Sequence, residues 1–105
     1  MFRFIRPAKG FRIIVEDLPK AYIDAEITEN PVVERLWSSL LLRMAFTALR
    51  EGEEIADGVW SYIAEGAPKL SIPTIQVLFR HDMTTIWIAH ALLWRPGEDD
   101  PDEDI

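Results

Sequence analysis

The sequence predicts an α+β fold in which a hairpin of two helices packs on an antiparallel sheet of about four strands. Residues 71–94 contain two apolar runs rich in Ile, Val, Phe, Thr and Trp, which suit half-buried strands. Residues 31–50 instead repeat apolar side chains every three or four positions, as an amphipathic helix does. Strands and helices that are grouped in this way along a chain are typical of two-layer α+β domains.

The two apolar runs, Thr74–Phe79 and Thr85–Leu93, flank a short polar stretch and predict a central β-hairpin. Strict alternation puts every second side chain of the later strand on one face. That set comprises Ile86, Ile88, His90 and Leu92. Neither face of the hairpin is purely polar, so we expect helices over one face and partial cover over the other.

Before the first helix, Phe2–Ile5 and Phe11–Glu16 are short β-prone runs separated by a break that contains Pro and Gly. They form either a hairpin or an arm that leads into the second run. Asp17 is then the expected N-cap of a short helix with Pro19 in its first turn, ending near Glu26.

The long helix is expected to run from Pro31 to about Arg50, with Asn30 as its N-cap and Gly52 as the residue that ends it. Its apolar stripe is broader than one sheet face requires. This excess fits a contact with a partner protein and a contact within a homodimer equally well.

The segment after this helix alternates between turns and strands. The acidic run Glu51–Glu54 is interpreted as a solvated helix end rather than as an acid–base or metal site. Val59–Ala64 predicts a strand, and Glu65–Pro68 predicts a turn. Lys69–Leu78 then enters the central hairpin, where Pro73 favours an edge position or a bulge.

Length and charge limit the organisation and the function. The 105 residues predict a single domain over residues 1–96 and an acidic, disordered tail over residues 97–105. The net charge is −7, and residues 13–97 still carry 7 basic and 12 acidic side chains. Such a body disfavours nonspecific binding to nucleic acid, because neutralised phosphates supply most of that affinity. Any contact with RNA must therefore depend on a local basic patch.

Other classes of site have little support in the sequence. There is no cysteine, which excludes disulfides and thiolate metal sites, and two histidines without clustered carboxylates are a weak metal signal. We find no phosphate-binding Gly-rich loop and no nucleophile elbow, so no cofactor is expected. No apolar run is long enough for a membrane span or a secretory signal, and a cytoplasmic location is expected.

A few side chains remain as functional candidates, each with a structural alternative. His90 lies within an apolar strand, where a half-buried structural imidazole is the usual role and acid–base catalysis the alternative. His81 lies beside the hairpin break, where an exposed turn residue is usual. Trp37 and Trp60 are expected in the core, whereas an exposed aromatic patch at Trp87 and Trp94 would indicate a partner surface.

The sequence of the central hairpin resembles that of a known protein family. Gln76–Asp82 (QVLFRHD) and Thr85–His90 (TIWIAH) resemble the last two strands of the RelE/ParE superfamily of bacterial toxin–antitoxin systems. The stretch ALREGEEI…GVWSYI resembles the family's helix end, its Gly-rich link and the next strand. The resemblance spans about residues 11–94. It implies a strand, two helices and an antiparallel meander, and a growth-inhibiting toxin that a cognate antitoxin neutralises.

In ribonucleolytic members of that family, basic and imidazole groups on the concave sheet face cleave messenger RNA. Gln76 stands where those members often have Arg. The candidate catalytic residues that the resemblance leaves are Lys69, Arg80, His81, His90 and Arg95. A gyrase-directed toxin would not need them, and a noncatalytic protein-interaction module on the same scaffold is the alternative. The expected partners are an antitoxin or another protein, with a homodimer as a further option and RNA disfavoured by charge.

Overall fold

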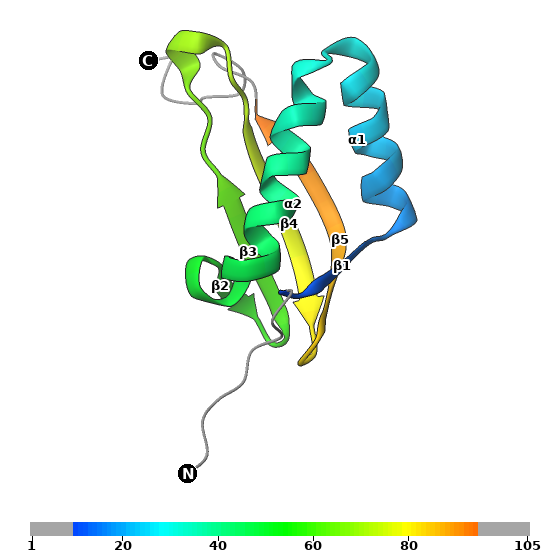
Figure 1. Cartoon of the computed structure of the whole chain (residues 1–105), viewed down its shortest axis with the longest axis vertical. Helices are drawn as coiled ribbons and strands as arrows, with labels where there is room; N and C mark the ends of the chain where they lie inside the picture. Colours follow the sequence, from blue (N-terminus) through cyan, green and yellow to red (C-terminus); the bar gives the residue numbers. More distant parts are fainter. Residues whose placement is uncertain (1–9, 95–105) are drawn as a thin grey trace.

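The computed structural model describes residues 10–94, so the predicted strand Phe2–Ile5, Arg95 and the acidic tail lie outside the described residues. The α+β prediction is confirmed, with both helices on one face of the sheet (Figure 1). The elements in order are β1 (Arg12–Val15), α1 (Asp17–Glu29), α2 (Val32–Glu51), β2 (Glu53–Ala56), β3 (Val59–Ala64), the 3-10 turn η1 (Pro68–Leu70), β4 (Thr74–His81) and β5 (Thr85–Trp94).

The sheet has five strands in the order β1-β5-β4-β3-β2. Strands β2 to β5 form an antiparallel meander. Strand β1 is parallel to β5, with Ile13 opposite Ile86, so the expectation of a purely antiparallel sheet was wrong at this edge. The first strand therefore pairs with the last, and the helical hairpin lies between them in sequence.

Both helices form close to where the sequence places them. Helix α2 is shifted by one residue from the prediction, so its N-cap is Pro31 rather than Asn30. The Asn30 side chain still accepts a hydrogen bond from the Val32 N–H at 3.2 Å. Helix α1 continues to Glu29, beyond the expected end. Its N-cap is Glu16 rather than Asp17, which lies in the first turn, where a carboxylate favours the helix dipole.

Gly52 ends α2 for a steric reason rather than a conformational one. Its φ of −82° is open to any residue. A Cβ there, however, would lie 2.4 Å from the Ala48 carbonyl oxygen and 3.1 Å from that of Ser61. A side chain at residue 52 would therefore collide with the last turn of α2 itself, and β3 would crowd it further. Glu51 ends α2, and Glu51, Glu53 and Glu54 are all exposed, as a solvated helix end predicts, but Glu53 and Glu54 already belong to β2, a strand that was not expected.

Strand β4 lies in the middle of the sheet, and the proline next to it lies outside it. Pro73 comes immediately before the strand, so no ladder hydrogen bond is lost. Lys69 belongs to η1 rather than to a strand. The expectation that a strand over Lys69–Leu78 would contain Pro73 at an edge or a bulge was therefore wrong.

A bulge in β5 changes which side chains face the helices. Leu78 pairs with His90, but Phe79 pairs with Ile88, so Ala89 is an extra residue in β5. Ile88 is fully buried under the helices, and beyond the bulge the buried side chains are Ala91 and Leu93. The expectation that side chains alternate strictly beyond Ile88 was therefore wrong. His90 faces away from the helices.

The core fills the space between the helices and this one face of the sheet. Trp60 and Phe79 stack with their ring centroids 6.2 Å apart. Trp37 and Trp60 are half-buried against the core, as expected for packing residues. The buried apolar side chains are Ile23, Val33, Leu40, Met44, Ala48, Tyr62, Ile75, Val77, Phe79, Ile86, Ile88, Ala91 and Leu93.

Candidate functional site

The face of the sheet opposite the helices is the largest candidate site, and we call it the open face. Neither helix lies over it in Figure 1. Its side chains are those that alternate with the buried ones on neighbouring strands. They are Arg12, Ile14, Glu16, Ser61, Ile63, Gln76, Leu78, Arg80, Trp87, His90, Leu92 and Trp94.

The half of the open face near the start of β4 is mainly apolar. Ile63, Leu92 and Trp94 expose 45%, 36% and 50% of their surface. Gln76 lies between Ile63 and Leu92 in register, and its amide donates to the Ser61 hydroxyl at 3.1 Å. A cluster of exposed aromatic and aliphatic side chains around one satisfied amide is typical of a surface that binds another protein.

The other half of the open face carries charged groups. The Arg80 guanidinium lies 3.6 Å from the Glu16 carboxylate. His90 pairs with Leu78 and Arg80 pairs with Trp87 in the same ladder, which makes His90 and Arg80 diagonal neighbours. Such neighbours are about 7–8 Å apart. A carboxylate, a guanidinium and an imidazole therefore share one part of this face.

The predicted catalytic residues are only partly brought together. Arg80 and His90 lie on the open face, whereas Lys69 lies in η1, before the start of β4. Six residues of β4 separate Thr74 from Arg80, which is about 20 Å at the rise of a strand. Lys69 is thus at the opposite end of the sheet from Arg80. Arg95 lies outside the described residues.

Glu16 is the residue of this cluster that sequence reasoning missed. It is the N-cap residue of α1 and comes directly after β1. Its N–H donates to the Ile88 carbonyl at 3.0 Å, which places it beside β5. The pairing of β1 with β5 brings together residues that are far apart in sequence, so no local pattern around Glu16 indicates its contact with Arg80.

His81 lies on the face of the sheet opposite to His90. Its ring makes edge contacts with Trp60 at 5.5 Å and with Phe11 at 6.3 Å between centroids. Its Nδ1 atom is 2.9 Å from the Asp82 carbonyl oxygen. His81 is therefore a half-buried packing residue at the end of β4, and the prediction of an exposed turn residue was wrong. It cannot share a substrate with His90.

Asp82 shapes the hairpin turn. Its carboxylate accepts hydrogen bonds from the N–H groups of Thr84 at 2.8 Å and Thr85 at 2.7 Å. These two backbone bonds lower the pKa of Asp82, because they stabilise its charged form. The hydrogen bonds of this carboxylate are therefore made within the turn itself.

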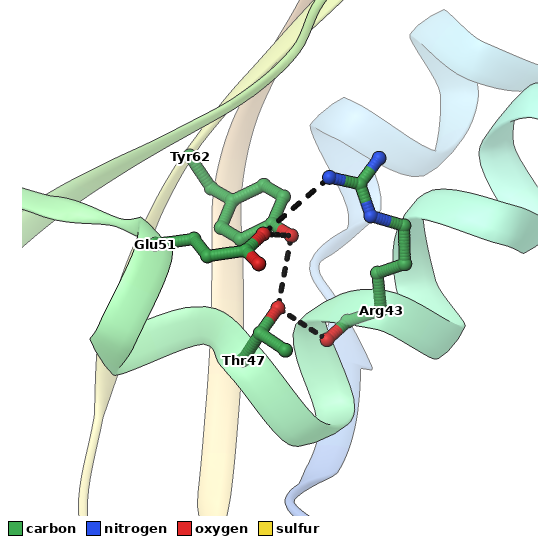
Figure 2. A network of polar contacts seen from close by, with 4 residues as sticks. All are labelled: Arg43, Thr47, Glu51 and Tyr62. Carbon is green, nitrogen blue, oxygen red and sulfur yellow. Dashed lines mark hydrogen bonds and ion pairs between the residues drawn. The ribbon is translucent and has the colours of Figure 1, made fainter.

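A second polar group joins α2 to β3 (Figure 2). The buried Tyr62 donates its hydroxyl proton to the Glu51 carboxylate at 2.8 Å, and the Thr47 hydroxyl lies 3.0 Å from the same oxygen of Tyr62. Thr47 in turn donates to the Arg43 carbonyl at 2.7 Å, and the Arg43 guanidinium lies 3.4 Å from Glu51. Each member has partners within the group, so its arrangement suits attachment of the helix to the sheet.

The charge states of this group follow from its contacts. The hydrogen bond from Tyr62 is the main cause of a lowered pKa for Glu51, and Arg43 lowers it further. Burial raises the pKa of Tyr62. Since the pKa of Glu51 is lower in the folded chain, its contribution to stability is present above the ordinary carboxyl pKa. That contribution is lost as the pH falls through the lowered value.

Replacing Tyr62 by Phe is expected to raise the pKa of Glu51 towards its ordinary value, because the carboxylate loses its main donor. Titration of the Glu51 side-chain carbon by NMR measures this change. Tyr22→Phe is the matched control, since the Tyr22 hydroxyl accepts from the Leu93 N–H at 3.0 Å instead. Equal Glu51 titration curves in the two variants would contradict the assignment.

Residues 10–94 contain no cluster of His, Asp and Glu suited to a metal ion. Every buried side-chain N or O atom of this described part has a hydrogen-bond partner. Neither of its helices is both long and apolar enough to span a membrane. Comparisons of the chain with protein-family models, with curated proteins and with solved structures find no match.

Proposed function

We propose that the protein is a divergent growth inhibitor of the RelE/ParE type that works by binding another protein through its open face. The observation that carries this proposal is the mainly apolar half of that face, where Ile63 of β3 and Leu92 and Trp94 of β5 are exposed on two neighbouring rows of the sheet. The order of strand, helical hairpin and antiparallel meander, which the sequence resemblance implies, supports the family assignment.

An apolar sheet face of this kind suits a protein target or an antitoxin better than a nucleic acid. The chain carries a net charge of −7, and Arg80 already has a carboxylate partner. Phosphate binding would have to compete with Glu16 for this guanidinium. Apolar contacts with a protein surface face no such competition.

The second candidate function is RNA cleavage, and the grouping of Glu16, Arg80 and His90 favours it. In this scheme Glu16 takes the proton of a ribose 2′-OH, and the oxygen attacks the adjacent phosphorus. Arg80 stabilises the charge on the phosphate. His90 gives a proton to the departing 5′-oxygen as the P–O bond breaks, which leaves a 2′,3′-cyclic phosphate. Trp87, opposite Arg80 on the same face, would stack a base.

Induced expression in a bacterial host tests both functions. We expect growth arrest by the wild-type chain. His90→Ala is compared with His81→Ala, because the two imidazoles lie on opposite faces of the sheet. Arrest that only His90→Ala relieves, in a soluble folded variant, would support cleavage. Arrest that neither variant relieves would support binding of a protein target. Soluble, folded wild-type protein without any arrest would contradict the toxin proposal.

A further inference from the structure

We propose that the acidic segment 98–104 of the same chain binds back across the open face, with its carboxylates on the charged half, and competes with the target for that face. This inference rests on the proposed function only in naming the open face as the working surface. The segment itself carries six acidic side chains and no basic one: Glu98, Asp99, Asp100, Asp102, Glu103 and Asp104.

The described part of the chain ends on the open face, next to the surface that the segment would contact. Trp94 is the last residue of β5, it lies on the open face, and it pairs with Thr74 at the apolar end. Pro96 and Gly97 come two and three residues later. This dipeptide favours a tight turn, because Pro suits its second position and Gly its third. A turn at this dipeptide would direct the following residues back along the face.

The length of the segment matches the distance that it must cover. His90 and Arg80 are four and six residues from the Thr74 row, or about 13 and 20 Å at the rise of a strand. Seven residues from Gly97 to Asp104 span up to about 25 Å. Asp102 thus reaches the row of His90, and Asp104 reaches that of Arg80.

The charges of the two surfaces are complementary. Arg12 and Arg80 project from the far end of the open face, and His90 lies between that end and Trp94. Glu16 balances only one of the two guanidinium groups. The tether keeps the segment at a millimolar effective concentration, so weak attraction is enough for frequent occupancy. Occupancy of four-fifths would weaken a competing ligand about fivefold.

Disulfide trapping tests this contact directly, since the chain has no cysteine of its own. In the full chain, Leu78→Cys with Asp102→Cys is compared with Ser39→Cys with Asp102→Cys. Leu78 lies on the open face, and Ser39 is exposed on α2. We expect the first pair to form an intramolecular disulfide about fivefold faster at low ionic strength, an advantage that shrinks at 1 M salt. Equal rates would overturn the proposal.

A second measurement requires neither cysteines nor activity. The imidazole resonances of both histidines are recorded in the full chain and in a variant with the six acidic side chains changed to their amides. We expect the His90 signal to move and the His81 signal to stay, because His81 packs on the opposite face against Trp60. If the signals of both histidines stay, the segment does not bind there. Both readouts are independent of growth arrest, so the failure of one proposal is distinguishable from failure of the other.

Discussion

Replacing Phe79 by Ala is expected to lower the free energy of unfolding by about 4 kcal/mol. The ring is fully buried in β4, the middle strand of the sheet, where it stacks on Trp60. Its removal leaves a cavity against the end of α2, because the Phe79 Cζ atom lies 3.5 Å from the place that a Cβ at residue 52 would occupy. Since the free energy of unfolding of a small domain is only about 5–15 kcal/mol, the variant should be close to unfolding at 37 °C.

Urea denaturation followed by tryptophan fluorescence measures this loss. Ile63→Ala is the control, since Ile63 lies on the open face and exposes 45% of its surface. We expect a loss below about 1 kcal/mol for the control. Similar losses in both variants would show that the open face is covered in the folded protein, contrary to the fold described above.

Replacing Leu92 by Asp is expected to abolish the growth arrest while leaving the fold intact. The side chain exposes 36% of its surface and lies opposite Gln76, two residues before Trp94 in β5, in the apolar half of the open face. A charge there must be desolvated when a protein partner binds. Central interface residues of this kind contribute about 2–4 kcal/mol, which is a loss of binding of about 30- to 800-fold.

Leu42→Asp is the matched control, because Leu42 exposes 66% of its surface on α2, on the other side of the sheet. Circular dichroism and urea denaturation are expected to show folded protein for both variants. If both variants arrest growth as the wild type does, the apolar half of the open face is not the binding surface. If Leu42→Asp alone relieves the arrest, the contact lies on α2.

Local patterns were sufficient to predict most of the elements. The spacing of apolar residues placed α2 within one residue of its observed bounds, and Val59–Ala64 was predicted with the bounds that the structure has. Strand β2 was missed because Glu53 and Glu54 have poor strand propensity. Its exposed position at the edge of the sheet requires no apolar pattern, and its pairing with β3 determines its conformation.

Local sequence patterns could not predict which residues form the candidate site, because a bulge and a long-range strand pairing bring them together. The extra residue Ala89 reverses the alternation of β5, and a bulge of this type leaves no mark in a run that is apolar on both sides. It turns His90 from the face of Ile86 and Ile88, where strict alternation places it, to the open face, which also carries Arg80. The contact of Glu16 with Arg80 depends on the pairing of β1 with β5, which involves the two ends of the domain.

That same pairing determines the order in which the chain can fold. Arg12–Val15 finds its partner in residues 85–88, so during synthesis the first strand has no ladder to join until nearly the whole domain has been made. The helical hairpin and the meander form mainly from contacts that are nearer in sequence. Because long loops close slowly, β1 is expected to be added last, and the free edge of β5 stays accessible until then. The time during which the edge of β5 can pair with a second copy of the chain therefore depends on how soon the first strand is added.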